Sequence, residues 1–273
     1  MTENRSGLIL VISALFLVAA FIELSYGSFY LGILFLALFI LMLLLTKKTT
    51  SEQELKPSYL RLAFGLILIF TVTVYNIHKN SEFQTLDSMV FLLGLSLVIS
   101  NFRKFAVIGR FSIYFSSIFL LFYISLFLIP ETIGFDLPYY YGHYFVTLPV
   151  VAVLQNLGYS ITVPEMRFIE VYGVEQTILK IDLACFGWYS LLLILSMVLA
   201  YSETIEKIEK RKLVLILITL SFASYLANLL RVAILVHLTY FYGTKTMLTV
   251  HSHLGWIIFA ILLLPLVKLM IFK

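Results

Sequence analysis

Charged residues are scarce in this sequence, and their scarcity excludes an ordinary soluble domain. Only 12% of the 273 residues are charged and 61% are apolar, whereas about a quarter of the residues in a typical soluble domain are charged. A globular fold of this length cannot cover its surface with so few ionic groups. The composition therefore predicts an integral membrane protein.

The sequence also has little cysteine and a small net charge. Cys185 is the only cysteine, so no intramolecular disulfide can form. The formal net charge is +4, and the basic residues are spread between apolar runs, which argues against a nucleic-acid-binding protein. His251 and His253 would point to different faces of a helix, and no nearby carboxylate completes a ligand set. We therefore expect neither a metal site nor a cofactor.

Long apolar runs fill most of the chain. A helix needs about 20 apolar residues to cross the hydrocarbon core of a bilayer. The predicted fold class is an all-α integral membrane protein with about eight transmembrane helices. The predicted spans lie near residues 7–26, 28–45, 60–77, 87–101, 111–129, 184–201, 213–238 and 250–272. They divide the chain into N-terminal membrane helices (1–129), an external loop (130–183) and C-terminal membrane helices (184–273).

The distribution of Lys and Arg between the predicted loops indicates the orientation, because cytoplasmic loops are enriched in these residues. One side of the membrane holds Arg5, Lys47, Lys48, Lys56, Arg61, Arg103, Lys104, Arg110, Lys207, Lys210, Arg211, Lys212, Lys268 and Lys273. The opposite side holds only Lys79, Arg167, Lys180 and Lys245. We expect a multi-pass protein of the cell membrane with both termini in the cytoplasm and the 130–183 loop outside.

The external loop is not simply hydrophilic. Residues 144–157 are apolar, too few to cross a bilayer and interrupted by Pro149, which favours a re-entrant or interfacial helix. Residues 167–172 and 176–182 flank a Gly173 turn and have the composition of two short strands. They predict a small β-hairpin at the outer surface.

A thiol, a fixed positive charge and an imidazole fall at one depth of the membrane. Cys185 opens the sixth span, Arg231 lies about 10 Å below the outer end of the seventh, and His251 begins the eighth. Taken singly, a membrane cysteine is usually a small buried residue, an Arg often snorkels to the surface, and interfacial histidines are common. Their shared depth on three consecutive helices favours a catalytic set at the outer face.

These three groups suit acyl transfer through a thioester. An Arg beside a thiol favours the thiolate and later an oxyanion, and a histidine can protonate a leaving amine and deprotonate an incoming nucleophile. Other polar residues lie close to this set in the sequence or share the helical face of Arg231. These supporting candidates are Asp182, Tyr225, Asn228 and His253.

Four segments, in order, resemble the exosortase/archaeosortase family of membrane transpeptidases. They are TLPVVAVLQNLGYSITV (147–163), LACFGWYSLL (183–192), NLLRVAIL (228–235) and HSHLGW (251–256). The resemblance implies that Cys185 is the nucleophile, Arg231 a catalytic cation and His251 an acid/base group. The spacing to Gly255 selects His251 over His253. Phe186 stands where many relatives have a small hydroxyl residue.

The resemblance also implies a function. Family members cleave a C-terminal sorting tail from surface proteins through a thioester and transfer the protein to a lipid or another acceptor. The implied partners are therefore the tails of secreted surface proteins and membrane lipid. Whether the acyl group passes to an acceptor or to water stays open at this point.

Other readings of the same residues remain. A transporter or channel would use Arg231 to line an anion path, and a lipid-headgroup transferase would use the same outer pocket. A purely structural membrane protein would leave Arg231 unexplained, because an Arg at the centre of a span costs about 2.5–3.5 kcal/mol on insertion scales.

Overall fold

The computed structural model describes Phe16, Ala20 and residues 29–45, 57–79, 84–183 and 185–271. It is mostly helical, with one small antiparallel sheet. Contacts divide the chain into two compact units. We call Met1–Tyr123 with Leu195–Val214 the helical unit, and Ile124–Ile194 with Leu215–Ile271 the sheet unit. The predicted division at residues 129/130 and 183/184 stays a prediction.

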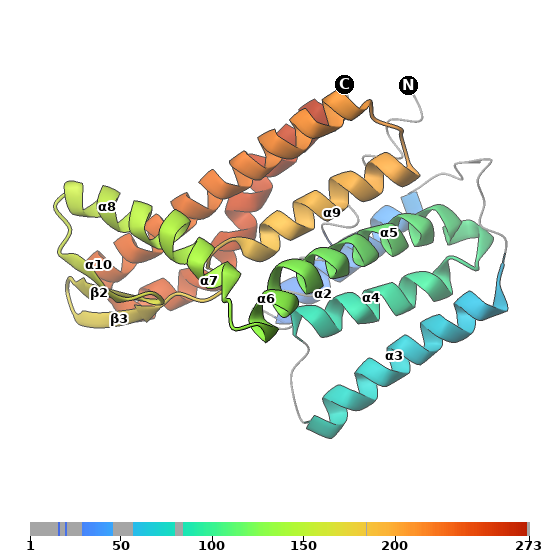
Figure 1. The fold of residues 1–273 in the computed structure, drawn as a ribbon, viewed down its shortest axis with the longest axis horizontal. Helices are drawn as coiled ribbons and strands as arrows, with labels where there is room; N and C mark the ends of the chain where they lie inside the picture. Colours follow the sequence, from blue (N-terminus) through green and yellow to red (C-terminus); the bar gives the residue numbers. More distant parts are fainter. Residues whose placement is uncertain are drawn as a thin grey trace. The chain divides into compact units, whose positions relative to one another are not determined.

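Apolar helices make up the described part of the helical unit. They are α2 (Phe29–Leu45), α3 (Tyr59–Lys79), α4 (Thr85–Ile99), the 3₁₀ turn η1 (Arg103–Phe105) and α5 (Ala106–Tyr123). Helix α3 packs on α4, and α4 on α5 (Figure 1). A Cβ atom on Gly65 would lie 2.7 Å from the Gly94 carbonyl oxygen. Small residues thus let two membrane helices approach closely.

The sheet unit begins with a series of short helices. These are the π-helical turn η2 (Ile124–Leu128), α6 (Ile129–Thr132), α7 (Leu137–Tyr141), the π-helical turn η3 (Gly142–Thr147) and α8 (Leu148–Asn156). Pro130, Pro138 and Pro149 each stand at the start of one of the α-helices, where a missing N–H costs nothing. Gly158 adopts a positive φ of 90° and lets the chain leave α8. The predicted helix at 144–157 is thus present.

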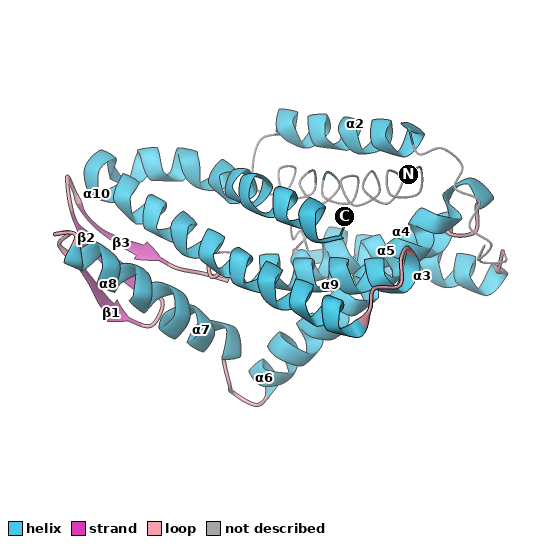
Figure 2. Cartoon of the chain, turned by 90° about the horizontal axis from the view of Figure 1, so that it is seen from above, coloured by secondary structure: helices cyan, strands magenta, loops and turns pink. Residues whose placement is uncertain are grey.

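The sheet contains the predicted hairpin and one further strand. Its strands, β1 (Ile161–Glu165), β2 (Phe168–Tyr172) and β3 (Gln176–Lys180), are antiparallel in the order β1-β2-β3. Helix α8 lies against β1 (Figure 2), and the Gln155 side-chain amide donates to the Ile161 carbonyl at 2.7 Å. Strand β1 was not predicted, because Pro164 interrupts its apolar pattern.

Two helices complete the chain, α9 (Trp188–Thr204) and α10 (Lys210–Ile271). Helix α10 covers the predicted span 213–238 and residues 250–271 of the predicted span 250–272, and two helices meet within it at Gly243, where the backbone is not helical. The predicted separation falls at this break, but the connection is shorter than the predicted residues 239–249. Hydropathy marks the part of a helix that suits lipid and does not mark where the helix ends.

Within the described residues, three helices are long and apolar enough to cross a membrane: Tyr59–Lys79, Ala106–Thr132 and Lys210–His251. Shorter apolar helices cover Tyr30–Phe39, Thr85–Ile99 and Trp188–Thr204. The predicted first span, 7–26, lies outside the described residues except at Phe16 and Ala20. The number of eight transmembrane helices therefore stays a prediction.

Candidate active site

Cys185 lies in a tight turn that precedes α9. Its N–H donates to the Asp182 carbonyl at 2.7 Å, and the N–H of Phe186 donates to the same oxygen at 3.2 Å. Gly187 then takes a φ of 71°, a conformation that suits glycine because it has no Cβ. These bonds make Asp182 and residues 185–187 the two ends of a tight turn that carries the cysteine.

Asn228 on α10 holds this turn. Its side-chain amide donates to the Cys185 carbonyl at 3.0 Å. A Cβ atom on Gly187 would lie only 2.6 Å from the carboxamide carbon of Asn228, so glycine is required for this close approach. The supporting candidate Asn228 thus joins the cysteine turn to the helix that carries Arg231.

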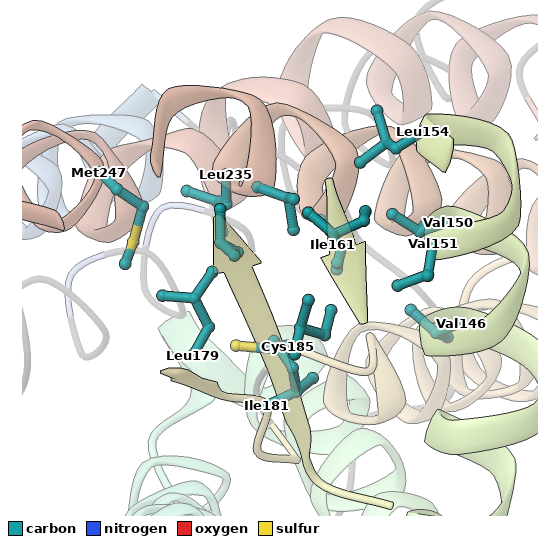
Figure 3. Packing of buried hydrophobic residues seen from close by; sticks show 14 of the residues in the cluster. Val146, Val150, Val151, Leu154, Ile161, Leu179, Ile181, Cys185, Leu235 and Met247 are labelled. Carbon is teal, nitrogen blue, oxygen red and sulfur yellow. The ribbon is translucent and has the colours of Figure 1, made fainter. Parts of the chain in front are cut away.

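Cys185 belongs to a cluster of buried apolar residues. Only 8% of Cys185 is exposed. The cluster draws on α8, all three strands and both halves of α10, and Figure 3 shows its core. Its members include Val150, Ile161, Ile169, Leu179, Phe186, Val232, Leu235 and Met247. Burial of this kind keeps water away from the thiol.

Arg231 lies on the first half of α10. It is on the face of α10 that carries Asn228, one turn earlier. Its guanidinium packs against Gly255, where an added Cβ would lie 3.2 Å from the guanidinium carbon. Arg231 therefore contacts the second half of α10 close to His251, and its neighbour Asn228 bonds to the turn that holds Cys185.

The chain matches a known protein family over most of its length. The family model described as Transmembrane exosortase (Exosortase_EpsH) matches residues 6–268. The chain belongs to the transmembrane exosortase family. No curated protein and no solved structure gives a match. The predicted family is confirmed, and the match extends through the N-terminal half, where the sequence motifs gave no indication.

The exosortase family is one of membrane transpeptidases that act on C-terminal sorting signals of substrate proteins. The four segments that carried the resemblance contribute α8, the cysteine turn and the two halves of α10 to the sheet unit. Phe186, which departs from the usual small hydroxyl residue, is fully buried. A Cβ atom on Gly142 would overlap its ring, so Phe186 packs the turn against η3.

Asp182 has a charged environment beside the cysteine turn. Its carboxylate pairs with Arg167 and, at 3.1 Å, with Lys180. Partial burial raises the pKa of Asp182, but the hydrogen bonds and charges of Arg167 and Lys180 outweigh it, so the pKa lies below its ordinary value. Asp182 therefore ties the cysteine turn to the sheet as a carboxylate.

Sequence reasoning missed Arg167 and Tyr139 as neighbours of this turn. The guanidinium of Arg167 lies 3.9 Å from the centre of the Tyr139 ring and donates to the Tyr139 hydroxyl at 3.0 Å. The signal was in the strand register, because pairing of Phe168 with Lys180 brings Arg167 beside residues 181 and 182. A hairpin prediction with an assigned register would have found the pair.

The remaining candidates lie at different distances from this centre. Tyr225 donates its hydroxyl to the Phe145 carbonyl at 2.8 Å and so joins α10 to η3. His253 is half-buried on the second half of α10, two residues beyond His251. Among the residues that the structure describes, no group of three or more His, Cys, Asp or Glu side chains is arranged to hold a metal ion.

Proposed function

We propose that this chain is a cysteine transpeptidase that cleaves the C-terminal sorting tails of surface proteins and transfers those proteins to a lipid or another acceptor. The observation that carries the proposal is that Arg231 packs against Gly255, four residues after His251, while Asn228, one turn before Arg231, donates to the Cys185 carbonyl. The family to which the chain belongs supports the substrate class.

The proposed reaction begins at the Cys185 thiolate, which the fixed charge of Arg231 favours. The sulfur bonds to the carbonyl carbon of the scissile peptide, and the negative charge on the carbonyl oxygen is stabilised by the guanidinium. The C–N bond then breaks, and protonated His251 gives its proton to the leaving amine. A thioester between Cys185 and the surface protein remains.

The second half of the reaction reverses these roles. His251 takes a proton from the acceptor nucleophile, which attacks the thioester carbonyl, and the C–S bond breaks to release the thiolate. The apolar cluster around Cys185 supports transfer over hydrolysis, because few water molecules can compete for a thioester in such surroundings. The Lys and Arg distribution supports a multi-pass orientation with cytoplasmic termini and this site at the outer face.

The test is the processing of a tailed surface protein encoded in the same genome, in cells whose only copy of the enzyme is wild type or Cys185→Ala. We expect the substrate to stay full length in the Cys185→Ala strain at equal enzyme level. Ser116→Ala is the matched control, because Ser116 is a fully buried small polar residue on α5 whose hydroxyl bonds within its own helix.

Hydroxylamine gives a second readout, because it attacks thioesters and releases the acyl group as a hydroxamate. We expect wild-type enzyme to release the cleaved surface protein as a hydroxamate and Cys185→Ala to release none. Normal processing by Cys185→Ala would contradict the proposal. Processing that needs Cys185 but never yields a hydroxamate would contradict the thioester.

A further inference from the structure

Helix α10 folds back on itself at one residue. Gly243 has φ 80° and ψ 170°, a conformation that side chains rarely allow. The first half of the helix ends before it and carries Arg231, and the second half starts after it and carries His251 and Gly255. Because Gly255 packs against the Arg231 guanidinium, the angle at Gly243 determines how the two halves meet.

The turn between β2 and β3 is attached to both sides of this break. The Val174 N–H donates to the Tyr240 carbonyl at 2.9 Å, which satisfies a carbonyl in the last turn of the first half. The Glu175 carboxylate accepts the Thr244 N–H at 2.5 Å, the first N–H of the second half. Both groups are helix-end groups that lack partners within the helix.

The surrounding contacts leave this turn little freedom. A Cβ atom on Gly173 would overlap the Tyr240 carbonyl oxygen, and one on Gly243 would lie 3.2 Å from the Glu175 carboxylate. Figure 1 shows β2 and β3 beside α10. A carboxylate at the N-terminus of a helix is also favoured by the helix dipole. Glu175 therefore acts as an N-terminal cap supplied by the sheet.

We propose that Glu175 is a positioning residue: by capping the second half of α10 from the β2–β3 turn, it fixes the angle at Gly243 and thereby places His251 and Gly255 against Arg231. The claim rests on the proposed function of that site. Arg231 lies twelve residues from the break, a length of about 18 Å, so a tilt of about 3° there moves the site by about 1 Å. A displacement of that size can lower a rate about 100-fold.

Processing rates test the catalytic side of the claim. We expect Glu175→Ala to lower kcat for processing about tenfold or more with little change in KM, because the reacting groups shift while the tail still binds. Glu175→Gln keeps an acceptor oxygen at the same place and should recover most of the rate. Glu170→Ala is the matched control, since the Glu170 carboxylate bonds to Gln176, Thr162 and Tyr172 within the sheet, and it should leave kcat unchanged.

A distance measurement tests the structural side without any activity. Leu226 and Ile261 are exposed residues on the two halves of α10. Spin labels on Leu226→Cys and Ile261→Cys, in a Cys185→Ser background, report the distance between the halves by pulsed electron paramagnetic resonance. We expect a narrow distribution in the background, with Glu175→Gln and with Glu170→Ala, and a broader one with Glu175→Ala.

The two readouts separate the possible failures. An unchanged distance distribution in Glu175→Ala overturns the capping role. A broader distribution together with a wild-type kcat overturns the positioning role. If the wild-type enzyme processes no tailed protein, the proposed function fails, and the distance distributions still decide whether Glu175 sets the angle.

Discussion

The two units of the chain differ in where their polar side chains find hydrogen-bond partners. In the helical unit, Thr73, Ser96 and Ser116 each donate to the carbonyl four residues earlier in their own helix. An exception is the bond at 2.7 Å from the Ser58 N–H to the Asn101 side chain. Local bonds of this kind make a polar residue tolerable inside a membrane helix without fixing one helix to another.

The sheet unit also has such local bonds, as from Thr239 to the Leu235 carbonyl, but in addition several of its polar side chains join segments that are far apart in the sequence. The pairs are Tyr225 with Phe145, Tyr159 with His237, Asn228 with Cys185, Arg167 with Asp182, and Glu175 with Thr244. Each pair fixes one element against another. The difference teaches that polar residues with local bonds maintain a helix, whereas those with distant bonds determine the geometry of a site.

The largest expected effect is at Arg231, the charge that the distant contacts hold in place. We expect Arg231→Ala to lower the processing rate by about 10²–10³, the usual loss when one stabilising group for an oxyanion is removed. Arg231→Lys keeps the charge but not the planar guanidinium, so its processing rate should lie between those of wild type and Arg231→Ala. Processing kinetics at equal enzyme level give the measurement.

The anion-path alternative makes a different prediction for the same residue. It expects Arg231→Ala to abolish anion uptake into vesicles while Cys185→Ala leaves that uptake unchanged. If Arg231→Ala processes tailed proteins at the wild-type rate, the proposed role of this residue is wrong.

A second prediction concerns the helical unit, where close packing at Gly65 and Gly94 joins α3 to α4. Gly65→Ala brings a Cβ to within 2.7 Å of the Gly94 carbonyl oxygen, and such overpacking costs about 1–3 kcal/mol. We expect a lower unfolding temperature in detergent with an unchanged processing rate per folded molecule. Leu66→Ala, an exposed position on the same helix, serves as control, and equal stability of the two variants would contradict the close contact.

Two buried asparagines give the most direct contrast between the units. Asn76 donates to the Val72 carbonyl within α3, and Asn228 donates to the Cys185 carbonyl. Removing a hydrogen bond costs about 1 kcal/mol. We therefore expect Asn228→Ala to lower the processing rate about five- to tenfold. Asn76→Ala should change stability alone. A rate loss of equal size in both variants would break the comparison.

The smallest effect is expected at Asp182, whose ion pairs are partly exposed. Because its pKa is lowered in the folded protein, its pairing with Arg167 and Lys180 stabilises the fold above the ordinary pKa of about 3.9. This stabilisation disappears as the pH falls through the folded-state pKa.

At pH 7, Asp182→Asn should therefore unfold at a lower temperature than wild type. The loss in the free energy of unfolding should be within about 1 kcal/mol. The difference should diminish at an acidic pH below the lowered folded-state pKa of Asp182, where both side chains are uncharged. Unfolding curves in detergent at the two pH values check this. A difference of the same size at both pH values would show that the ion pair does not cause it.

The sequence predicted the features that depend on local pattern. Scarce charge indicated a membrane protein, Gly173 between two short runs predicted the β2–β3 hairpin, and ordered motifs predicted the family. It failed at β1 because Pro164 breaks an apolar run, yet proline is tolerated there since β1 is an edge strand. At residues 239–249 the sequence predicted a connection between two spans, and the structure shortens it to a break at Gly243 between two helices.

The sequence by itself determined which residues are available for chemistry, since Cys185, Arg231 and His251 stand out by type and by predicted depth. Only the tertiary structure decided that Asn228 holds the Cys185 turn, that Gly255 packs against Arg231, and that the β2–β3 turn caps α10 at its break. The physical reason is that such contacts join residues distant in the chain, and the side-chain packing of the folded unit determines them rather than any local pattern.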